Sequence, residues 1–188
     1  MIVVVLVALV VAKMPLADQT LPLIRLKKVR LIPQIEMISL VLTSQKETEK
    51  LARTVAHLLE KGDVVLLSGD LGGGKSTFAR ALIRTLTNPE EEVPSPTFTL
   101  VQTYEAAAFP IWHFDLYRLE FPEEIWELGF EETTQGVTLI EWPQKMGTLM
   151  PEEALHLTFE YGETEDERRV TLTGSERWLN RIQNIKNP

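Results

Sequence analysis

The chain has 188 residues, 44% of them hydrophobic and 7% aromatic, which is the composition of a globular domain and excludes a disordered segment. Its 27 acidic and 19 basic side chains leave a net charge of −8, which argues against an extended surface for nucleic acid. The absence of cysteine excludes disulfides, zinc–thiolate sites and thiol nucleophiles, and is compatible with a reducing cytoplasm.

Residues 2–12 form an uncharged apolar run. As a helix this run would span about 16 Å, roughly half of a hydrocarbon core, and no basic segment precedes it as a signal peptide requires. Three interpretations stay open: a leader upstream of the true start at Met37, a weak membrane anchor, or an extra strand packed on the domain. We favour the first. It makes residues 1–36 an N-terminal extension and 37–188 the domain, with no role at a membrane.

The first half of the domain alternates between strands and helices. Ile38–Leu42 reads as a strand, and Thr43 or Ser44 can cap the helix that follows, with Glu47 completing a capping box and Gly62 ending the helix. An unbroken apolar run, Val64–Leu67, predicts a strand buried on both faces. A second helix then carries an apolar face, at Phe78, Ala81, Leu82 and Leu86.

The second half predicts more strands, ending in a hairpin. Strands are expected over residues 97–105, 111–119 and 137–140, with a helix starting at Pro122. Residues 154–161 and 168–174 alternate around an acidic turn, and Ser175 can cap a short last helix. Together these elements predict an α/β sandwich, with a mostly parallel central sheet and an antiparallel C-terminal hairpin.

A glycine-rich segment lies between the buried strand and the second helix. It fits the pattern G-x-x-x-x-G-K-[ST] with Gly69, Gly74, Lys75 and Ser76. Glycines allow backbone N–H groups to approach phosphate oxygens, and the helix that follows starts with unpaired N–H groups and a positive dipole end. Lys75 would supply a charge for the outer phosphates and Ser76 a hydroxyl for Mg²⁺. The segment therefore predicts phosphate binding, and with it a P-loop NTPase-like form of the α/β sandwich.

A phosphate loop that binds Mg²⁺ needs an acid at the end of a neighbouring strand, and two candidates qualify. Glu141 follows the apolar run 137–140, and Asp115 ends the strand before it. Both could face the phosphates, or each could be an ordinary acid at a strand end. Residues 95–99 could form a loop that senses the γ-phosphate or a plain connection. Trp142 could lie near a nucleotide, although the core is the safer expectation, and Arg118 could offset phosphate charge or pair with Glu120.

The motifs GDLGGGKSTFARAL, SPTFTLVQTYE, HFDLYRLE, ELGFEE and LIEWP, in this order, resemble the TsaE (YjeE-type) family over about residues 39–173. The resemblance implies a small P-loop ATPase that is weak by itself. It also implies that ATP binds at Gly72, Gly73, Gly74, Lys75, Ser76 and Thr77. By the same resemblance Ser76 and Glu141 would hold Mg²⁺, and Asp115 would be essential for hydrolysis alongside Lys75 and Glu141. The family usually has Gly-Ala-Gly-Lys-Thr where this chain has Gly-Gly-Gly-Lys-Ser, and serine keeps the hydroxyl.

The resemblance further implies a function. The chain would be a cytoplasmic, Mg²⁺-dependent ATPase needed to form threonylcarbamoyladenosine at position 37 of ANN-decoding tRNAs. It would act with TsaD-type and TsaB-type subunits, which would make most of the contact with tRNA. Two alternatives are a small-molecule P-loop kinase, although no arginine-rich lid is evident, and a nucleotide-switched interaction protein without meaningful turnover.

Overall fold

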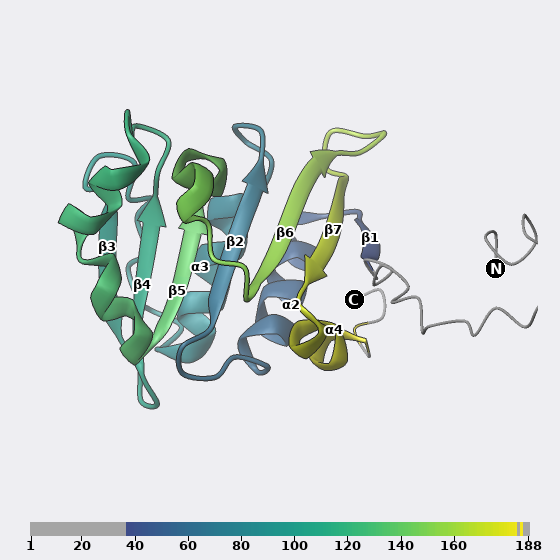
Figure 1. The fold of residues 1–188 in the computed structure, drawn as a ribbon. Helices are drawn as coiled ribbons and strands as arrows, with labels where there is room; N and C mark the ends of the chain where they lie inside the picture. Colours follow the sequence, from purple (N-terminus) through teal and green to yellow (C-terminus); the bar gives the residue numbers. More distant parts are fainter. Residues whose placement is uncertain (1–36, 184, 186–188) are drawn as a thin grey trace, which may run out of the picture. The chain divides into compact units, whose positions relative to one another are not determined.

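A seven-stranded sheet, in the order β1-β7-β6-β2-β5-β4-β3, organises the computed structural model, which describes residues 37–183 and 185 (Figure 1). In the centre β6, β2, β5 and β4 run parallel, while β3 pairs antiparallel with β4 and β7 pairs antiparallel with both β6 and β1. The strands are β1 (Ile38–Leu42), β2 (Val64–Gly69), β3 (Val101–Glu105), β4 (Pro110–Asp115), β5 (Val137–Glu141), β6 (Ala154–Tyr161) and β7 (Arg168–Gly174).

This topology confirms the predicted α/β fold with a mostly parallel centre and an antiparallel C-terminal hairpin, β6–β7. The sequence did not indicate the antiparallel pairing of β3 with β4 or of β1 with β7. The N-terminal extension predicted for residues 1–36 lies outside the described residues, so the leader, the anchor and the extra strand remain predictions.

Helices cover both faces of the sheet, which therefore has an apolar core on each side. Val65 and Leu67 of β2 join one core together with α2 (Gln45–Ala56), α3 (Lys75–Leu86) and α4 (Glu176–Ile182). Leu66, between them in sequence, joins the other core, as the period of two in a strand requires. That second core packs against three 3₁₀ helices, η2 (Pro122–Leu128), η3 (Phe130–Gln135) and η4 (Pro143–Leu149). Among the described residues, no helix has the length and apolar character needed to cross a membrane.

Two ends of predicted elements differ in the structure. Ser44 is the N-cap residue of α2, but its side chain makes no cap hydrogen bond; Glu47 instead accepts from the Thr43 backbone N–H at 2.5 Å. The helix ends at Ala56 rather than at Gly62, which lies in the turn before β2 and donates its N–H to the Gly136 carbonyl at 2.7 Å. The predicted capping box and the predicted helix end are therefore both wrong.

The strand predicted over 97–105 is confirmed only from Val101 onwards. Before it, Pro96–Thr99 form a turn, and the Leu100 N–H donates to the Pro96 carbonyl at 2.7 Å. Leu100 itself has a φ of 64°, a backbone conformation that residues other than glycine rarely adopt. The following strand is also shorter than predicted and ends at Asp115. These two shorter strands leave the segment 95–100 and Asp115 free to meet at one end of the sheet.

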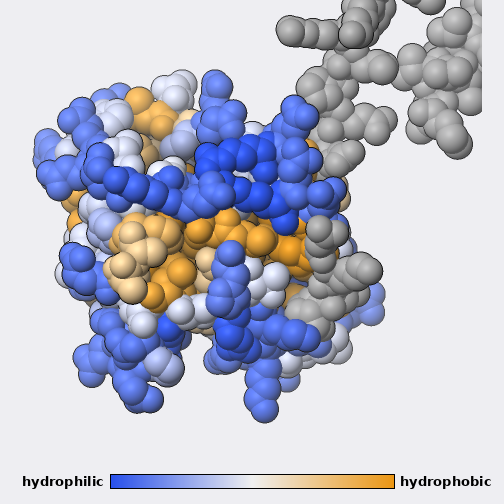
Figure 2. All heavy atoms as spheres, turned by 90° about the horizontal axis from the view of Figure 1, so that it is seen from below, coloured by the Kyte–Doolittle hydropathy of each residue, from blue (hydrophilic) through white to orange (hydrophobic). Residues whose placement is uncertain are grey.

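The parallel strands have their carboxyl ends at the top of Figure 1, where the loop between β2 and α3 lies. Figure 2 views the opposite end, where an apolar patch is surrounded by hydrophilic residues. The glycine-rich segment and the two acidic candidates belong to the carboxyl end, so that end holds the candidate site.

Candidate phosphate and metal site

The loop between β2 and α3 has a backbone that only glycine accommodates well. Gly74 is the N-cap residue of α3 with a φ of 110°, and Gly69 at the end of β2 has a φ of 131°. A Cβ atom at Gly69 would lie 2.2 Å from the Phe159 carbonyl oxygen of β6. The first N–H groups of α3 have no acceptor within the helix. The loop therefore leaves backbone donors that could hold an anion such as phosphate.

Lys75, the first residue of α3, is held tightly against this loop. Only 4% of it is exposed, and its Nζ donates to the Gly69 carbonyl at 2.7 Å and to the Asp70 carbonyl at 2.8 Å. The same Nζ lies 4.1 Å from the centroid of the Trp142 ring. Burial lowers the pKa of Lys75, and the negative charges of Glu141, Asp115 and Asp70 oppose that effect. The structure thus fixes an amine where the sequence pattern predicts a phosphate contact.

The two predicted acids are neighbours at the ends of β4 and β5. Asp115 pairs with Glu141 in the strand register, and Ser76 Oγ donates to Glu141 Oε2 at 2.9 Å. Hydroxyl and carboxylate oxygens are ligands that Mg²⁺ accepts, usually one or two of them together with phosphate oxygens and water. No three His, Asp or Glu side chains converge as a metal site within residues 37–183 and 185. The donor set therefore fits Mg²⁺ bound together with phosphates better than a metal held by protein alone.

Asp115 connects the candidate site to the proline-containing loop. Its Oδ2 accepts from Thr97 Oγ1 at 2.8 Å and from Ser95 Oγ at 3.4 Å, while its Oδ1 accepts the Tyr117 N–H at 3.0 Å. Three donors thus fix the orientation of the carboxylate. Two hydroxyls of the 95–99 loop, those of Ser95 and Thr97, therefore contact one of the two candidate acids directly.

These side chains share a small hollow of about 160 Å³. Trp142, which has a φ of 59°, both lines this hollow and packs against the core that contains η4, so its two predicted roles are not exclusive. Arg118 does not line the hollow, and its guanidinium lies 4.4 Å from the centroid of the Phe98 ring. Gly73 does not line the hollow and donates its N–H to the Asp70 carbonyl. The hollow is lined by Leu71, Gly72, Gly74, Lys75, Ser76, Thr77, Ser95, Thr97, Asp115, Glu141 and Trp142.

Sequence reasoning missed His113, which the structure places directly against Glu141. His113 Nε2 lies 2.9 Å from Glu141 Oε1, and both residues are buried. The three histidines are far apart in the sequence, and that spacing gave no reason to single one out. The available signal was the position of His113 two residues before Asp115, which puts both on the same face of one strand.

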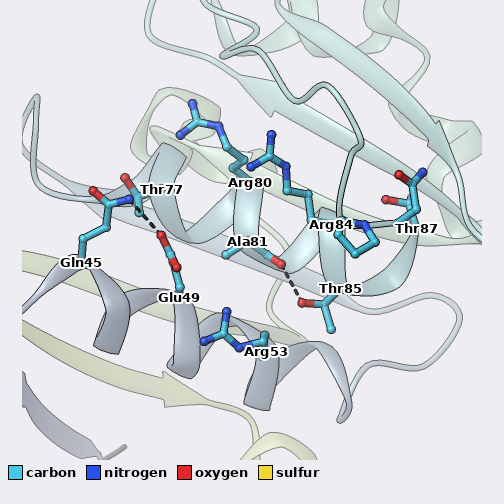
Figure 3. A pocket seen from close by; sticks show the side chains of 11 residues that line it. Gln45, Glu49, Arg53, Thr77, Arg80, Ala81, Arg84, Thr85 and Thr87 are labelled. Carbon is cyan, nitrogen blue, oxygen red and sulfur yellow. Dashed lines mark hydrogen bonds between the residues drawn. The ribbon is translucent and has the colours of Figure 1, made fainter.

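A larger groove, of about 510 Å³, lies between α2 and α3 (Figure 3). Thr77 reaches it at the end near the glycine loop, and Arg80 crosses its rim to donate from Nε to the Val93 carbonyl at 3.2 Å. Neither candidate acid lines this groove. The residues that could perform chemistry are therefore in the smaller hollow.

The fold and the site together define a class: α/β proteins with a strand–glycine loop–helix unit that faces a carboxylate on the neighbouring parallel strand. Residues 42–170 match the family model described as threonylcarbamoyl adenosine biosynthesis protein TsaE. The chain belongs to the TsaE family.

Relatives in bacteria support this assignment. The chain is 47% identical over 120 residues to a TsaE protein of Rickettsia conorii, covering 63% of this chain and 69% of that one. It is 37% identical over 130 residues to TsaE of Bacillus subtilis, covering 68% and 80%. The crystal structure of YdiB from Bacillus subtilis superposes with a TM-score of 0.66 at 29% identity, covering 79% of this chain and 93% of that one.

Proposed function

We propose that this protein is a Mg²⁺-dependent ATPase that acts in the formation of threonylcarbamoyladenosine at position 37 of ANN-decoding tRNAs. The observation that carries the proposal is the contact between Ser76 Oγ and Glu141 Oε2, 2.9 Å apart. It joins the hydroxyl that follows the glycine loop to the acid of the neighbouring strand. That juxtaposition is what a Mg²⁺–nucleotide site requires, and relatives with similar sequences carry the name tRNA threonylcarbamoyladenosine biosynthesis protein.

The chain's own groups have separate tasks in this proposal. Backbone N–H groups of residues 72–77, other than that of Gly73, which donates to the Asp70 carbonyl, would hold the phosphates. Lys75 Nζ would leave its two carbonyl acceptors to contact the outer phosphates. Ser76 and Glu141 would hold Mg²⁺. When bound, the ion supplies positive charge that offsets the charge of the phosphates.

Asp115 would orient the water that attacks the outer phosphate. Its carboxylate already has a fixed orientation, because Thr97 and the Tyr117 backbone donate to its two oxygens. A carboxylate held in this way can accept a hydrogen bond from water without first reorganising. The 95–99 loop would then respond to whether the outer phosphate is bound, since the hydroxyls of Ser95 and Thr97 contact the same carboxylate.

Hydrolysis would be coupled to partners, namely the TsaD-type and TsaB-type subunits of a cytoplasmic tRNA-modifying complex. Large apolar side chains next to the hollow are exposed, Leu71 by 82% and Phe98 by 81%. Both belong to segments that would touch the nucleotide, so a partner that covers them would sense whether ATP is bound. With a net charge of −8, the chain would leave most tRNA contact to these partners.

The test is phosphate release from ATP with Mg²⁺, measured for the protein alone and with the two partner subunits. We expect slow release that rises with the partners and is lost in Lys75→Ala. The matched control is Lys61→Ala, because Lys61 is an exposed lysine that donates to Gln135 far from the hollow.

Three results would contradict the proposal. Release at the same rate with and without partners would separate the ATPase from the complex, and transfer of the phosphoryl group to a metabolite would indicate a small-molecule kinase instead. Partner binding in the presence of ATP with no hydrolysis over hours would indicate a nucleotide-switched interaction protein.

A further inference from the structure

We propose that His113 is a positioning residue that holds the Glu141 carboxylate in the orientation needed to bind Mg²⁺. The inference rests on the proposed function, since it assigns a role within the same site. His113 Nε2 lies 2.9 Å from Glu141 Oε1, while Ser76 Oγ donates to Glu141 Oε2. Each carboxylate oxygen therefore has its own partner, and the two partners lie on different elements, β4 and α3.

Burial makes this contact necessary for Glu141. The side chains of His113 and Glu141 are 1% and 2% exposed, so water reaches little of the carboxylate and the protein must supply most of its hydrogen bonds. A carboxylate oxygen accepts and cannot donate, so the proton in this contact belongs to His113 Nε2. The opposite ring nitrogen, Nδ1, is buried and has no hydrogen-bond partner within the described part of the chain. Glu141 is thus the polar group that fixes the orientation of the His113 ring.

The strand register explains why His113 acts through Glu141 rather than on a ligand. Asp115 of β4 pairs with Glu141 of β5 at the carboxyl ends of the two strands. His113 pairs with Leu139, two residues earlier on each strand. Alternate residues share a face, so His113 lies on the same face as Asp115 but deeper in the sheet. Asp115 and Glu141 line the hollow, whereas His113 does not. The imidazole therefore supports the carboxylate from the side that faces away from the hollow.

Removing this support leaves Glu141 free to adopt other rotamers and leaves one oxygen buried without a donor. Groups that orient metal ligands in this way typically change metal affinity about 10–100-fold when they are replaced. The binding of phosphates to the glycine loop does not depend on Glu141. The effect is therefore confined to the part of nucleotide binding that requires Mg²⁺.

The experiment measures the affinity for a fluorescent ADP analogue with excess EDTA and across a Mg²⁺ titration. In His113→Leu we expect the affinity for the analogue in EDTA to stay within about twofold of that of the unchanged protein. The Mg²⁺ concentration that gives half of the Mg²⁺-dependent change in affinity should rise about 10–100-fold. His113→Gln restores a donor near the position of Nε2 and should recover most of the Mg²⁺ effect. The matched control is His156→Leu, because His156 contacts Ser68 and not Glu141.

The outcomes separate this inference from the proposed function. If the unchanged protein binds the analogue with a Mg²⁺ effect that His113→Leu retains, the positioning role is wrong while the proposed function stands. If the unchanged protein binds no nucleotide, both fail. Ring ¹⁵N NMR gives a readout independent of nucleotide: we expect a proton on Nε2 of His113, and a ring protonated on Nδ1 alone would contradict the contact.

Discussion

At the scale of single residues, Gly69 shows how closely the glycine loop is tied to the sheet. Its φ of 131° is unfavourable for any side chain, and a Cβ would lie 2.2 Å from the carbonyl oxygen of Phe159. Gly69→Ala should therefore force β2 and β6 apart and lower the free energy of unfolding by about 3 kcal/mol or more. Urea denaturation measures this loss.

Gly129 supplies the control for that prediction. It also has a positive φ, of 78°, but a Cβ there would meet no atom within 4 Å. Gly129→Ala should show the backbone strain alone, about 1–2 kcal/mol. Equal losses in the two variants would mean that the contact with Phe159 has no energetic importance.

Thr97 offers a second test at this scale, because its hydroxyl donates to Asp115 Oδ2 at 2.8 Å. Thr97→Val keeps the shape of the side chain and removes the donor, so Asp115 loses part of its fixed orientation. For the ATP hydrolysis proposed above, we expect kcat to fall about tenfold, which corresponds to about 1.4 kcal/mol, with little change in the affinity for ATP. Steady-state kinetics together with equilibrium binding separates the two effects.

Thr99 provides the comparison within the same loop. It is exposed, and its side chain makes no hydrogen bond within the described residues. Thr99→Val should leave kcat unchanged. A Thr97→Val variant with the kcat of the unchanged enzyme would show that the loop is a plain connection.

At the scale of elements, two arginines attach α4 to the loop before β2. Arg181 Nη1 contacts Asp63 Oδ2 at 2.6 Å, and Arg177 Nη2 contacts Asp63 Oδ1 at 3.3 Å. The Asp63 side chain is fully buried, whereas Arg181 is 14% exposed and Arg177 is 51% exposed. The better-buried arginine should therefore contribute more of the attachment.

We predict that Arg181→Gln destabilises the fold by about 3 kcal/mol, since it leaves a buried carboxylate without its main partner. Arg177→Gln should cost clearly less than Arg181→Gln, because exposed ion pairs contribute little to stability. Thermal unfolding of both variants gives the comparison. An equal loss of stability would mean that burial does not distinguish the two arginines.

The strands and loops also show how much of the fold and of the candidate site can be predicted from the sequence alone. The carboxyl ends of parallel strands meet at one edge, so the positions of Asp115 and Glu141 after apolar runs were enough to single out both as candidates for the glycine-loop edge, although each could still have been an ordinary acid at a strand end. The turn before Leu100 could not be predicted, because a positive φ at a leucine has no local signal. His113 was missed for a related reason: its partner belongs to a neighbouring strand, and its role depends on burial and register, which only the folded sheet determines.

At the scale of the whole molecule, His156 should make the global stability depend on pH. Burial lowers its pKa from the ordinary value of 6.5, so the unfolded chain takes up a proton at a higher pH than the folded protein does. The stabilising contribution is therefore present above about pH 6.5 and is lost as the pH falls through the lower pKa of the folded state. We expect the free energy of unfolding to fall with pH in this range.

Replacing the histidine tests this expectation. His156→Gln should flatten the dependence on pH below about pH 6.5, as measured by urea denaturation at several pH values. His57→Gln, at an exposed position, serves as the comparison and should keep the curve of the unchanged protein. A curve for His156→Gln as steep as that of the unchanged protein would contradict the assignment.

The strand order also determines when, during synthesis of the chain, each strand can pair with its neighbours. β2 pairs with β5 and β6, and β1 pairs with β7, so the strand that leads into the glycine loop leaves the ribosome well before its neighbours in the sheet. At about 5–20 residues per second, this delay lasts several seconds, during which an apolar segment has no partner. Every residue that lines the hollow is made before β6, yet β2, which leads into the glycine loop, pairs with β6 along its whole length, up to Gly69 beside Phe159. A nascent chain stalled after Trp142 would therefore contain all the residues of the hollow and still lack the site.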